Sequence, residues 1–312
     1  MRQIKEVHMY DLIIIGSGPA GMSAAIYATR AKLDFIIIEQ NFMSGGQVVN
    51  TYEVDNYPAV PGISGMDLSM QMREHAEKLG AEFITAEVTA LELKGDVKKV
   101  VTDDETYEAK TVILAMGANH RKLGVPGELE LAGMGVSYCA TCDGAFFRGR
   151  EVAVVGGGDV AVEDAIFLAR LCSKVYVVHR RDELRAAKVL QDRLLALPNV
   201  EMLWSRTLTS ISGENGQVSS ILTASTKGEG DREVAVSGVF MAVGIQPTNS
   251  LVEGQLALDR GGYIEAGEDG RTSEPGVFAA GDLRTKQLRQ IITACADGAN
   301  CVTSVQDYLI AH

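Results

Sequence analysis

Short runs of consecutive apolar residues alternate along the chain with longer segments that are rich in Ala and Met. The run Tyr10–Ile15 leads into a glycine-rich turn, the segment Pro19–Lys32 follows, and a second apolar run covers Asp34–Glu39. Unbroken apolar runs of this kind are typical of parallel strands buried on both faces. The pattern therefore predicts a strand, a helix and a second, parallel strand.

The same pattern returns in the middle of the chain. Its second copy consists of a strand at Glu151–Val155, a turn at Gly156–Gly158, a helix at Val160–Cys172 and a strand at Lys174–His179. A similar later strand follows each copy, at Thr111–Gly117 (TVILAMG) and at Gly238–Gly244 (GVFMAVG). The repeat predicts an α/β protein with two Rossmann-like dinucleotide-binding domains, and hence two bound dinucleotides.

A further strand and turn at Gly276–Asp282 (GVFAAGD) resembles the end of the first copy. We therefore expect a discontinuous first domain of residues 1–117 and 249–312, with a second domain of residues 118–248 inserted into it. A chain of 312 residues suits two domains of ordinary size. Two connections between the domains permit relative rotation unless their interface is large.

Composition narrows the function. The net charge of −12 disfavours nucleic acid as a partner, because a nucleic-acid binder neutralises phosphates with basic side chains. No apolar run approaches the ~20 residues of a membrane span, and no export signal is recognisable. We therefore expect a cytoplasmic protein that does not bind membranes.

The first glycine-rich turn has the sequence Gly16-Ser17-Gly18-Pro19-Ala20-Gly21. In a GxGxxG turn the glycines permit the tight turn, close approach of a pyrophosphate, and packing of helix on strand, while the helix N-terminus attracts the anion. Glu39, at the end of the next strand, can accept hydrogen bonds from a ribose diol and repels a 2′-phosphate. The site is therefore predicted to bind FAD or NAD; a turn without a ligand is the alternative.

The second turn, Gly156-Gly157-Gly158-Asp159-Val160-Ala161, fits the GxGxxA variant. The position that matches Glu39 carries no acid, and the sequence there is His179-Arg180-Arg181, with Arg185 following. Guanidinium groups are planar donors suited to phosphate, so this site is predicted to bind NADPH in preference to NADH. Alternatively, the three arginines form surface ion pairs with Asp182 and Glu183.

Cys139 and Cys142 form a CxxC pair at the start of the inserted domain. A zinc site would normally require further ligands, and the sequence contains no second CxxC and no HxxxH, so we expect no metal. A structural disulfide is uncommon in the cytoplasm, so we interpret the pair as redox-active. Asp143 is a candidate for the proton transfer that thiol–disulfide exchange requires, and it also suits the N-cap of a following helix.

The combination of GSGPAG, GGQ, CATCDG, GGGD-x-A, HRRDELRA and AAGD followed by RQ resembles the low-molecular-weight bacterial thioredoxin reductases. The resemblance covers nearly the whole chain in the same order, and CATCDG between two dinucleotide folds is highly specific. It implies a homodimer whose subunits bind FAD and NADPH and reduce the disulfide of thioredoxin or a thioredoxin-like protein. It also implies that the inserted domain rotates, so that nicotinamide and disulfide meet the flavin alternately.

The resemblance assigns roles to single residues. Cys142 is implied to lie nearer the flavin, Cys139 to attack the thioredoxin disulfide, and Asp143 to act as the general acid. Arg289, which by itself is typical of a solvated surface charge, is implied to contact the flavin. The positions that match flavin contacts are Gly46, Gln47, Asn56, Asp282, Arg289 and Gln290, and Gln40 and Ile291 are also expected to bind the cofactor. Arg180, Arg181 and Arg185 are implied to bind the 2′-phosphate.

Some positions depart from the family pattern. Met116 stands where Thr is common, and Val160 stands where Ser or Thr is usual. The remaining cysteines, at positions 172, 295 and 301, have no implied role and are typical of small buried apolar residues.

Four other functions are compatible with parts of the pattern. A reductase that serves a peroxiredoxin usually carries extra N-terminal redox domains, and a ferredoxin-driven thioredoxin reductase lacks the basic 2′-phosphate motif. A dithiol oxidase that passes electrons to oxygen is distinguished by anaerobic bleaching of the flavin with NADPH. A nucleotide sensor without turnover is disfavoured by the CxxC-Asp sequence beside two complete nucleotide motifs.

Overall fold

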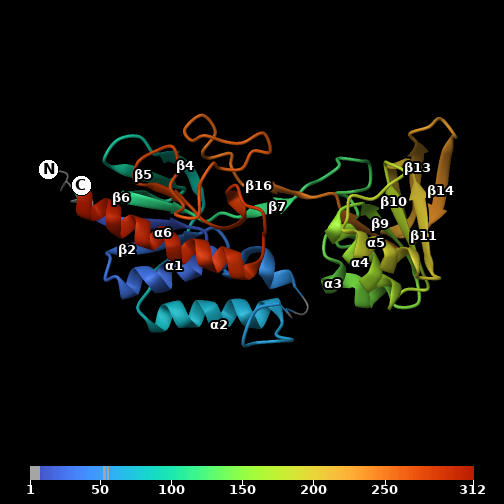
Figure 1. The fold of residues 1–312 in the computed structure, drawn as a ribbon, viewed down its shortest axis with the longest axis horizontal. Coiled ribbons are helices and arrows are strands. Elements are labelled where there is room, and N and C mark those ends of the chain that lie inside the picture. Colours follow the sequence, from blue (N-terminus) through green and yellow to red (C-terminus); the bar gives the residue numbers. More distant parts are fainter. Residues whose placement is uncertain (1–7, 52–53, 55) are drawn as a thin grey trace. The chain divides into compact units, whose positions relative to one another are not determined.

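The computed structural model describes residues 8–51, 54 and 56–312, and it divides the chain into two compact units (Figure 1). We call Met1–Asn119 with Gln246–His312 the outer unit, and His120–Ile245 the inserted unit. The two connecting segments, β7 (Ala118–His120) and β16 (Ile245–Pro247), pair as a two-stranded sheet.

The outer unit is a helix-covered sheet. Its strands are β1 (Met9–Ile15), β2 (Phe35–Glu39), β3 (Phe83–Thr85), β4 (Val88–Glu92), β5 (Lys98–Thr102), β6 (Thr106–Leu114) and β17 (Val277–Ala279). Its helices are α1 (Pro19–Arg30), α2 (Gly65–Lys78) and α6 (Ile291–Ala311), with 3₁₀ turns η1 (Gly46–Asn50) and η3 (Gly281–Leu283).

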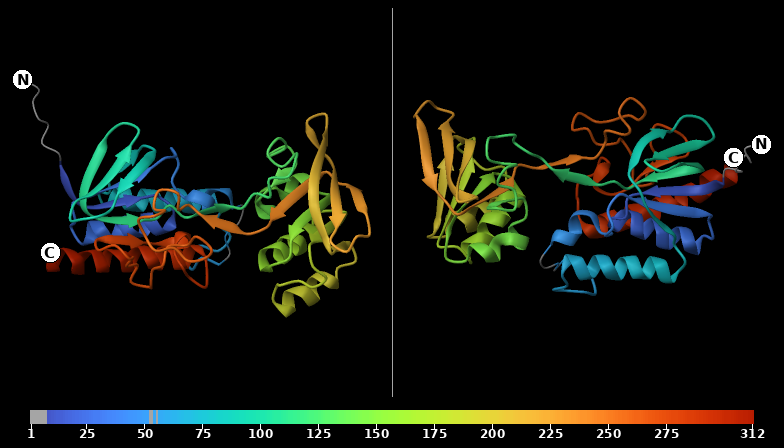
Figure 2. Two further views of the ribbon diagram at one scale, coloured as in Figure 1. Left: turned by 90° about the horizontal axis from the view of Figure 1, so that it is seen from above. Right: turned by 180° about the vertical axis from the view of Figure 1, so that it is seen from behind.

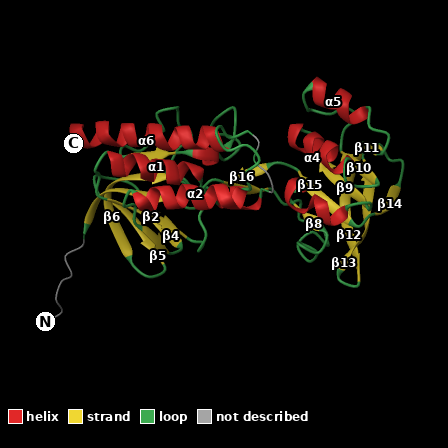
Figure 3. Ribbon diagram, turned by 90° about the horizontal axis from the view of Figure 1, so that it is seen from below, coloured by secondary structure: helices red, strands yellow, loops and turns green. Residues whose placement is uncertain are grey.

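The seven strands follow the order β3-β2-β1-β6-β5-β4, and β17 also pairs with β6. Strands β3, β2, β1, β6 and β17 are parallel, whereas β5 and β4 continue the sheet in antiparallel pairing. Figure 3 shows α6, α1 and α2 side by side. The carboxyl ends of the parallel strands meet at one edge of the sheet, where ligands bind in folds of this kind.

The inserted unit repeats this plan. Its strands are β8 (Val136–Ser137), β9 (Glu151–Gly156), β10 (Lys174–His179), β11 (Val200–Trp204), β12 (Arg206–Glu214), β13 (Gln217–Ser225), β14 (Asp231–Ala235) and β15 (Gly238–Ala242). Its helices are α3 (Ala140–Asp143), α4 (Asp159–Ala169) and α5 (Lys188–Leu195), with the 3₁₀ turn η2 (Gly144–Phe147). A parallel sheet of order β11-β10-β9-β15-β8 packs against an antiparallel sheet of order β12-β13-β14 (Figure 2).

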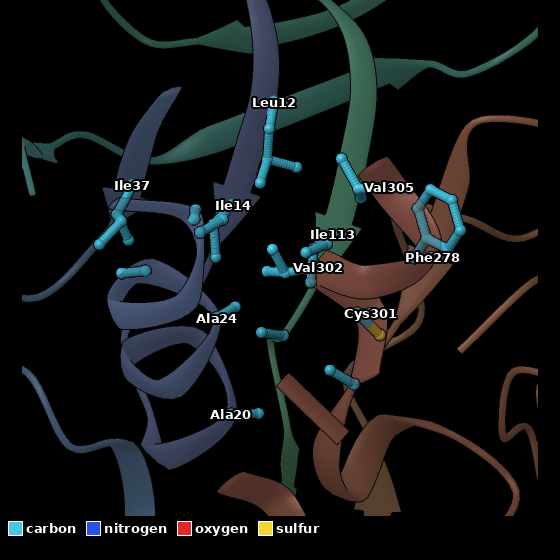
Figure 4. Packing of buried hydrophobic residues seen from close by; sticks show 14 of the residues in the cluster. Leu12, Ile14, Ala20, Ala24, Ile37, Ile113, Phe278, Cys301, Val302 and Val305 are labelled. Atoms are coloured by element: carbon cyan, nitrogen blue, oxygen red, sulfur yellow. The ribbon is translucent and has the colours of Figure 1, made fainter. Parts of the chain in front are cut away.

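The apolar runs are explained by burial on both faces of each parallel sheet. In β1, Leu12 and Ile14 pack with α1 and α6, as Figure 4 shows, whereas Ile13 and Ile15 pack on the opposite face with residues that include Val252. These four β1 side chains are at most 4% exposed. Full burial of each contributes about 1.5–3 kcal/mol, so interrupting the run with a polar residue would be costly on either face.

The predicted fold class is confirmed, since each unit contains the strand–helix–strand unit and the later parallel strand. Gly276–Asp282 forms β17 and η3, and β17 pairs with β6 of the first half of the outer unit. The antiparallel pair β4–β5 and the sheet β12–β14 were not predicted, because their strands contain no long apolar run; β4 and β14, for example, each have a single buried position. Among the described residues no helix is both long and apolar enough to cross a bilayer.

Candidate functional site

The turn between β1 and α1 is shaped by its glycines. Gly16 has a φ of +98°, which favours glycine, and a Cβ on Gly21 would overlap the carbonyl oxygen of Gly16. Gly18 precedes α1, and a Cβ there would meet nothing within 4 Å, so this side of the turn is open. With Pro19 at its start, α1 directs its N-terminal backbone N–H groups toward this opening, which suits a pyrophosphate.

Glu39 closes the turn from the end of β2. Its Oε2 accepts hydrogen bonds from Ser17 N at 2.8 Å and Ser17 Oγ at 2.9 Å, and its Oε1 accepts from Asn41 N at 2.9 Å and Asn41 Nδ2 at 3.1 Å. A carboxylate has about four acceptor positions, so all are occupied. A ribose diol would therefore displace the Ser17 hydroxyl or the Asn41 side chain, both of which can rotate. Gln40, between Glu39 and Asn41, is exposed.

A second loop lies beside the turn. Gly45 N donates to Ser17 O at 2.9 Å, and a Cβ on Gly46 would lie 3.8 Å from the Cα of Gly18. Gly46 has a φ of +58°, and both it and Gln47 are exposed. The structure thus brings the GGQ sequence next to the glycine turn, as a shared ligand would require.

Two segments of the outer unit that are far apart in the sequence are also in contact. Asn56 Nδ2 donates to Gln290 Oε1 at 2.8 Å, although 234 residues separate them. Gln290 immediately precedes α6, which begins at Ile291, and its backbone N donates to Thr293 Oγ1 at 3.1 Å. Two predicted flavin positions are therefore joined directly.

Asp282 presents an unsatisfied acceptor. Its Oδ1 is the one buried side-chain nitrogen or oxygen without a hydrogen-bond partner among the residues that the structure describes. Burial raises the pKa of Asp282, although the charges of Lys286 and Arg289 oppose this. An unsatisfied buried acceptor is costly, and a ligand hydroxyl would satisfy it. The outer unit therefore fits a dinucleotide with a hydroxylated chain, as FAD has.

Arg289 is not a free surface charge. Its Nε donates to Asp282 O at 3.4 Å, its Nη2 donates to Arg284 O at 3.3 Å, and its guanidinium lies 3.9 Å from the centre of the Tyr263 ring. The side chain thus braces the segment that carries Asp282.

A buried charged cluster that the sequence pattern did not predict lies behind Asp282. Asp297 accepts hydrogen bonds from Gly281 N, Arg284 Nε, Arg284 Nη2 and Lys286 Nζ at 2.9, 2.9, 2.6 and 2.7 Å. Arg284 is 6% exposed and Asp297 is 4% exposed. An acidic residue within the apolar sequence of α6 was the available signal, but its partners could not be inferred from spacing.

The second glycine turn has the same construction in the inserted unit. A Cβ on Gly156 would overlap the carbonyl oxygen of Ala242, and Gly158 precedes α4 with open space around its Cα. Ala161 is 1% exposed, which explains why a small residue stands there. Asp159 Oδ1 accepts a hydrogen bond from Ala187 N at 2.7 Å, so its carboxylate holds the segment before α5.

His179 packs against the second glycine turn. It is not among the residues that line the basic cavity at the end of β10. It is 5% exposed, a Cβ on Gly157 would overlap its ring, and its Nε2 is 3.0 Å from Glu183 O. Burial lowers the pKa of His179, which favours a neutral ring. The residue therefore packs the turn from below.

A basic cavity of about 510 Å³ lies at the end of β10. It is lined by Arg180, Arg181, Asp182, Glu183, Leu184, Arg185, Ser205, Thr226 and Lys227. Among the described residues, no ion pair or hydrogen bond involves the guanidinium groups of the three arginines. Asp182 pairs instead with Lys227 at 2.9 Å, so the alternative in which it neutralises the arginines is not observed. The sequence did not predict that Ser205, Thr226 and Lys227 line this cavity, because nothing in their local sequence relates them to the arginine motif.

The CxxC segment forms the short helix α3. Cys139 is disulfide-bonded, its backbone N donates to Ser137 Oγ at 3.0 Å, and its backbone oxygen accepts from Asp143 N at 3.2 Å. The side chain of Cys142 lies outside the part of the chain that the structure describes. Asp143 ends α3 and is half-buried, so a carboxylate stands within one short helix of Cys139.

Three other cysteines are free. Burial raises the pKa of Cys172 to about 11 and that of Cys301 to about 12, which disfavours the reactive thiolate. Cys295 is half-buried and its Sγ lies 3.8 Å from Tyr57 Oη. Of the two departures from the family pattern, Met116 packs against the outer core, and Val160 is 64% exposed at the start of α4.

Two dinucleotide folds, one with a basic cavity and a disulfide-bonded cysteine, define a nucleotide-dependent disulfide oxidoreductase. The family model for pyridine nucleotide-disulphide oxidoreductases matches residues 10–298. The chain belongs to this family, and the resemblance inferred from its motifs is confirmed.

Several proteins similar to this chain are thioredoxin reductases. The chain is 46% identical to a thioredoxin reductase of Bacillus subtilis, with 98% of this chain and 96% of that protein covered. It is 47% identical to a thioredoxin reductase of Listeria innocua, over 97% and 95% of the two chains. The crystal structure of Lactococcus lactis thioredoxin reductase matches with a TM-score of 0.87 and 42% identity, over 97% of this chain and 100% of that one.

Proposed function

We propose that the chain is an NADPH-dependent flavoenzyme that reduces the disulfide of thioredoxin, or of a thioredoxin-like protein, through FAD and a redox-active Cys139–Cys142 disulfide. The observation that carries the proposal is that disulfide-bonded Cys139 lies in the same unit as a cavity lined by three arginines whose guanidinium groups make no ion pair or hydrogen bond with the described residues. The names of the relatives, which match nearly the whole chain, support thioredoxin as the substrate.

We assign FAD to residues 1–117 and 249–312, and NADPH to residues 118–248. In the first domain the glycine turn would hold the pyrophosphate, Glu39 the ribose, and Asp282 a hydroxyl of the ribityl chain. In the second domain Gly156 and Gly158 would admit the pyrophosphate, and the arginines would bind the 2′-phosphate. When bound, FAD supplies the means to take a hydride from NADPH and to deliver two electrons to a disulfide.

The cysteines then act by thiol–disulfide exchange. The Cys139 thiolate attacks one sulfur of the thioredoxin disulfide, which forms a mixed disulfide and releases a thiolate that takes up a proton, with Asp143 as the proposed donor. The Cys142 thiolate attacks Cys139 Sγ, which restores the pair and releases the second thioredoxin thiol. Two electrons and two protons are thus transferred. We also propose a cytoplasmic homodimer, which light scattering of the purified protein tests.

The decisive experiment measures NADPH-dependent reduction of an insulin disulfide with and without the host's thioredoxins. Wild type should require thioredoxin, and Cys142→Ser should lose turnover while NADPH still bleaches its flavin anaerobically. Cys172→Ser, at a free buried cysteine, is the matched control and should retain turnover. Thioredoxin reduction by Cys142→Ser would contradict the mechanism, and a protein that binds no flavin would contradict the function itself.

A further inference from the structure

The arginine-rich loop also contains a carboxylate, which competes with a phosphate for the guanidinium groups. Asp182 stands between Arg181 and Arg185 and lines the same cavity. A carboxylate there would pair with a guanidinium group or repel a phosphate dianion at close range. Selectivity for a 2′-phosphate therefore requires that the charge of Asp182 be engaged elsewhere.

Lys227 engages it. Lys227 Nζ lies 2.9 Å from Asp182 Oδ2, although 45 residues separate them. The hydrogen bond with Asp182 raises the pKa of Lys227 and lowers that of Asp182, so both groups are charged at neutral pH. Their side chains are 54% and 66% exposed, so the pair adds little to folding stability and can be altered without unfolding the unit.

The backbone holds Lys227 at this place. Ser205, which has a φ of +52°, donates its N–H to Arg181 O at 3.0 Å. Thr226, next to Lys227, donates from its N to Ser205 O at 2.7 Å and from its Oγ1 to Arg180 O at 3.4 Å. The turn after β13 is thus hydrogen-bonded to the arginine loop, both directly through Thr226 and through Ser205, which lies between β11 and β12.

We propose that Lys227 is a specificity-determining residue for the 2′-phosphate: it occupies Asp182 and leaves the three guanidinium groups available to the phosphate. The inference rests on the proposed NADPH site and adds to it a positioning residue from outside the HRRDELRA sequence. Its role is indirect, because Lys227 acts through Asp182.

Calorimetric titration with two probes tests the proposal. 2′,5′-ADP carries the 2′-phosphate and 5′-AMP lacks it. Lys227→Gln should bind 2′,5′-ADP about twofold to fivefold more weakly than wild type, the upper part of the range for one exposed charge pair, with 5′-AMP unchanged. The double variant Asp182→Asn/Lys227→Gln should recover most of the lost affinity, because the freed carboxylate is gone. Lys110→Gln is the matched control: Lys110 pairs with Asp11 at 2.8 Å in the outer unit, is also 54% exposed, and should bind both probes as wild type does.

Each outcome is informative. Equal affinity of Lys227→Gln and wild type for 2′,5′-ADP overturns the inference, and so does a loss that the double variant fails to recover, which would mean direct contact with phosphate. If wild type itself does not prefer 2′,5′-ADP to 5′-AMP, the NADPH assignment fails instead. A difference that shrinks at high salt supports the electrostatic argument.

Discussion

Replacing Asp297 with Ala should destabilise the outer unit more than any single exposed substitution. Asp297 accepts four hydrogen bonds, from Gly281 N, from two nitrogens of Arg284 and from Lys286 Nζ. The side chains of Arg284 and Lys286 are 8% and 6% exposed, so removing the carboxylate leaves two cations buried without their counter-ion.

The expected loss of unfolding free energy follows from the burial of Asp297 and its two cationic partners. Hydrogen bonds to a charged group contribute about 1.5–3 kcal/mol each, but their sum overestimates the loss because water enters the space that the carboxylate leaves. Breaking a buried ion pair by removing one partner costs about 3–5 kcal/mol, and we expect Asp297→Ala to fall in this range. Since Asp297 also holds Gly281, the residue before Asp282, FAD affinity should fall as well.

The assay is urea unfolding of the FAD-free protein followed by circular dichroism, with fluorescence of Trp204, the single tryptophan, as a reporter on the inserted unit. Asp307→Ala is the control on the same helix, because Asp307 is 67% exposed and pairs with Arg271 at 3.9 Å. This control should lie within about 0.5 kcal/mol of wild type. A loss below about 1 kcal/mol for Asp297→Ala would refute the reasoning from burial.

Other predictions concern cofactor affinity, pH and thiol chemistry. Asp282→Ala should weaken FAD binding about tenfold or more, because a ribityl hydroxyl loses its acceptor; titration of apoprotein with FAD measures this, and unchanged affinity would contradict the role of the unsatisfied oxygen. Burial and the charge of Glu163 raise the pKa of Asp164 to about 7, above the ~3.9 of an unfolded chain, so its ionisation should destabilise the fold as pH rises between these values. Asp164→Asn should therefore be more stable than wild type by about 4 kcal/mol at pH 8, but by only about 0.5 kcal/mol at pH 4; the same difference at both pH values would exclude titration as the cause. Cys172 and Cys301 should resist iodoacetamide at pH 8 in the native protein and react in urea, and rapid labelling without denaturant would show that their burial is wrong.

Local sequence was enough to predict the two strand–turn–helix units, because strand burial, the glycine turn and the helix start all act within about 30 residues. For the same reason the sequence placed Arg180 directly after the strand that became β10, and Glu39 at the end of the strand that became β2. The contacts of Glu39 became clear only from the structure.

Side-chain partners between distant segments were decided by the tertiary fold. Asp297 with Arg284, Asp182 with Lys227, and Asn56 with Gln290 are brought together by strand order and by the return of the chain to the first sheet. A charged residue pairs with whichever opposite charge the packing brings within a few ångströms, and sequence spacing carries no information on that distance. The apolar pattern therefore determined where the two glycine turns of the proposed nucleotide sites form, and packing of distant segments determined which charges near them are paired.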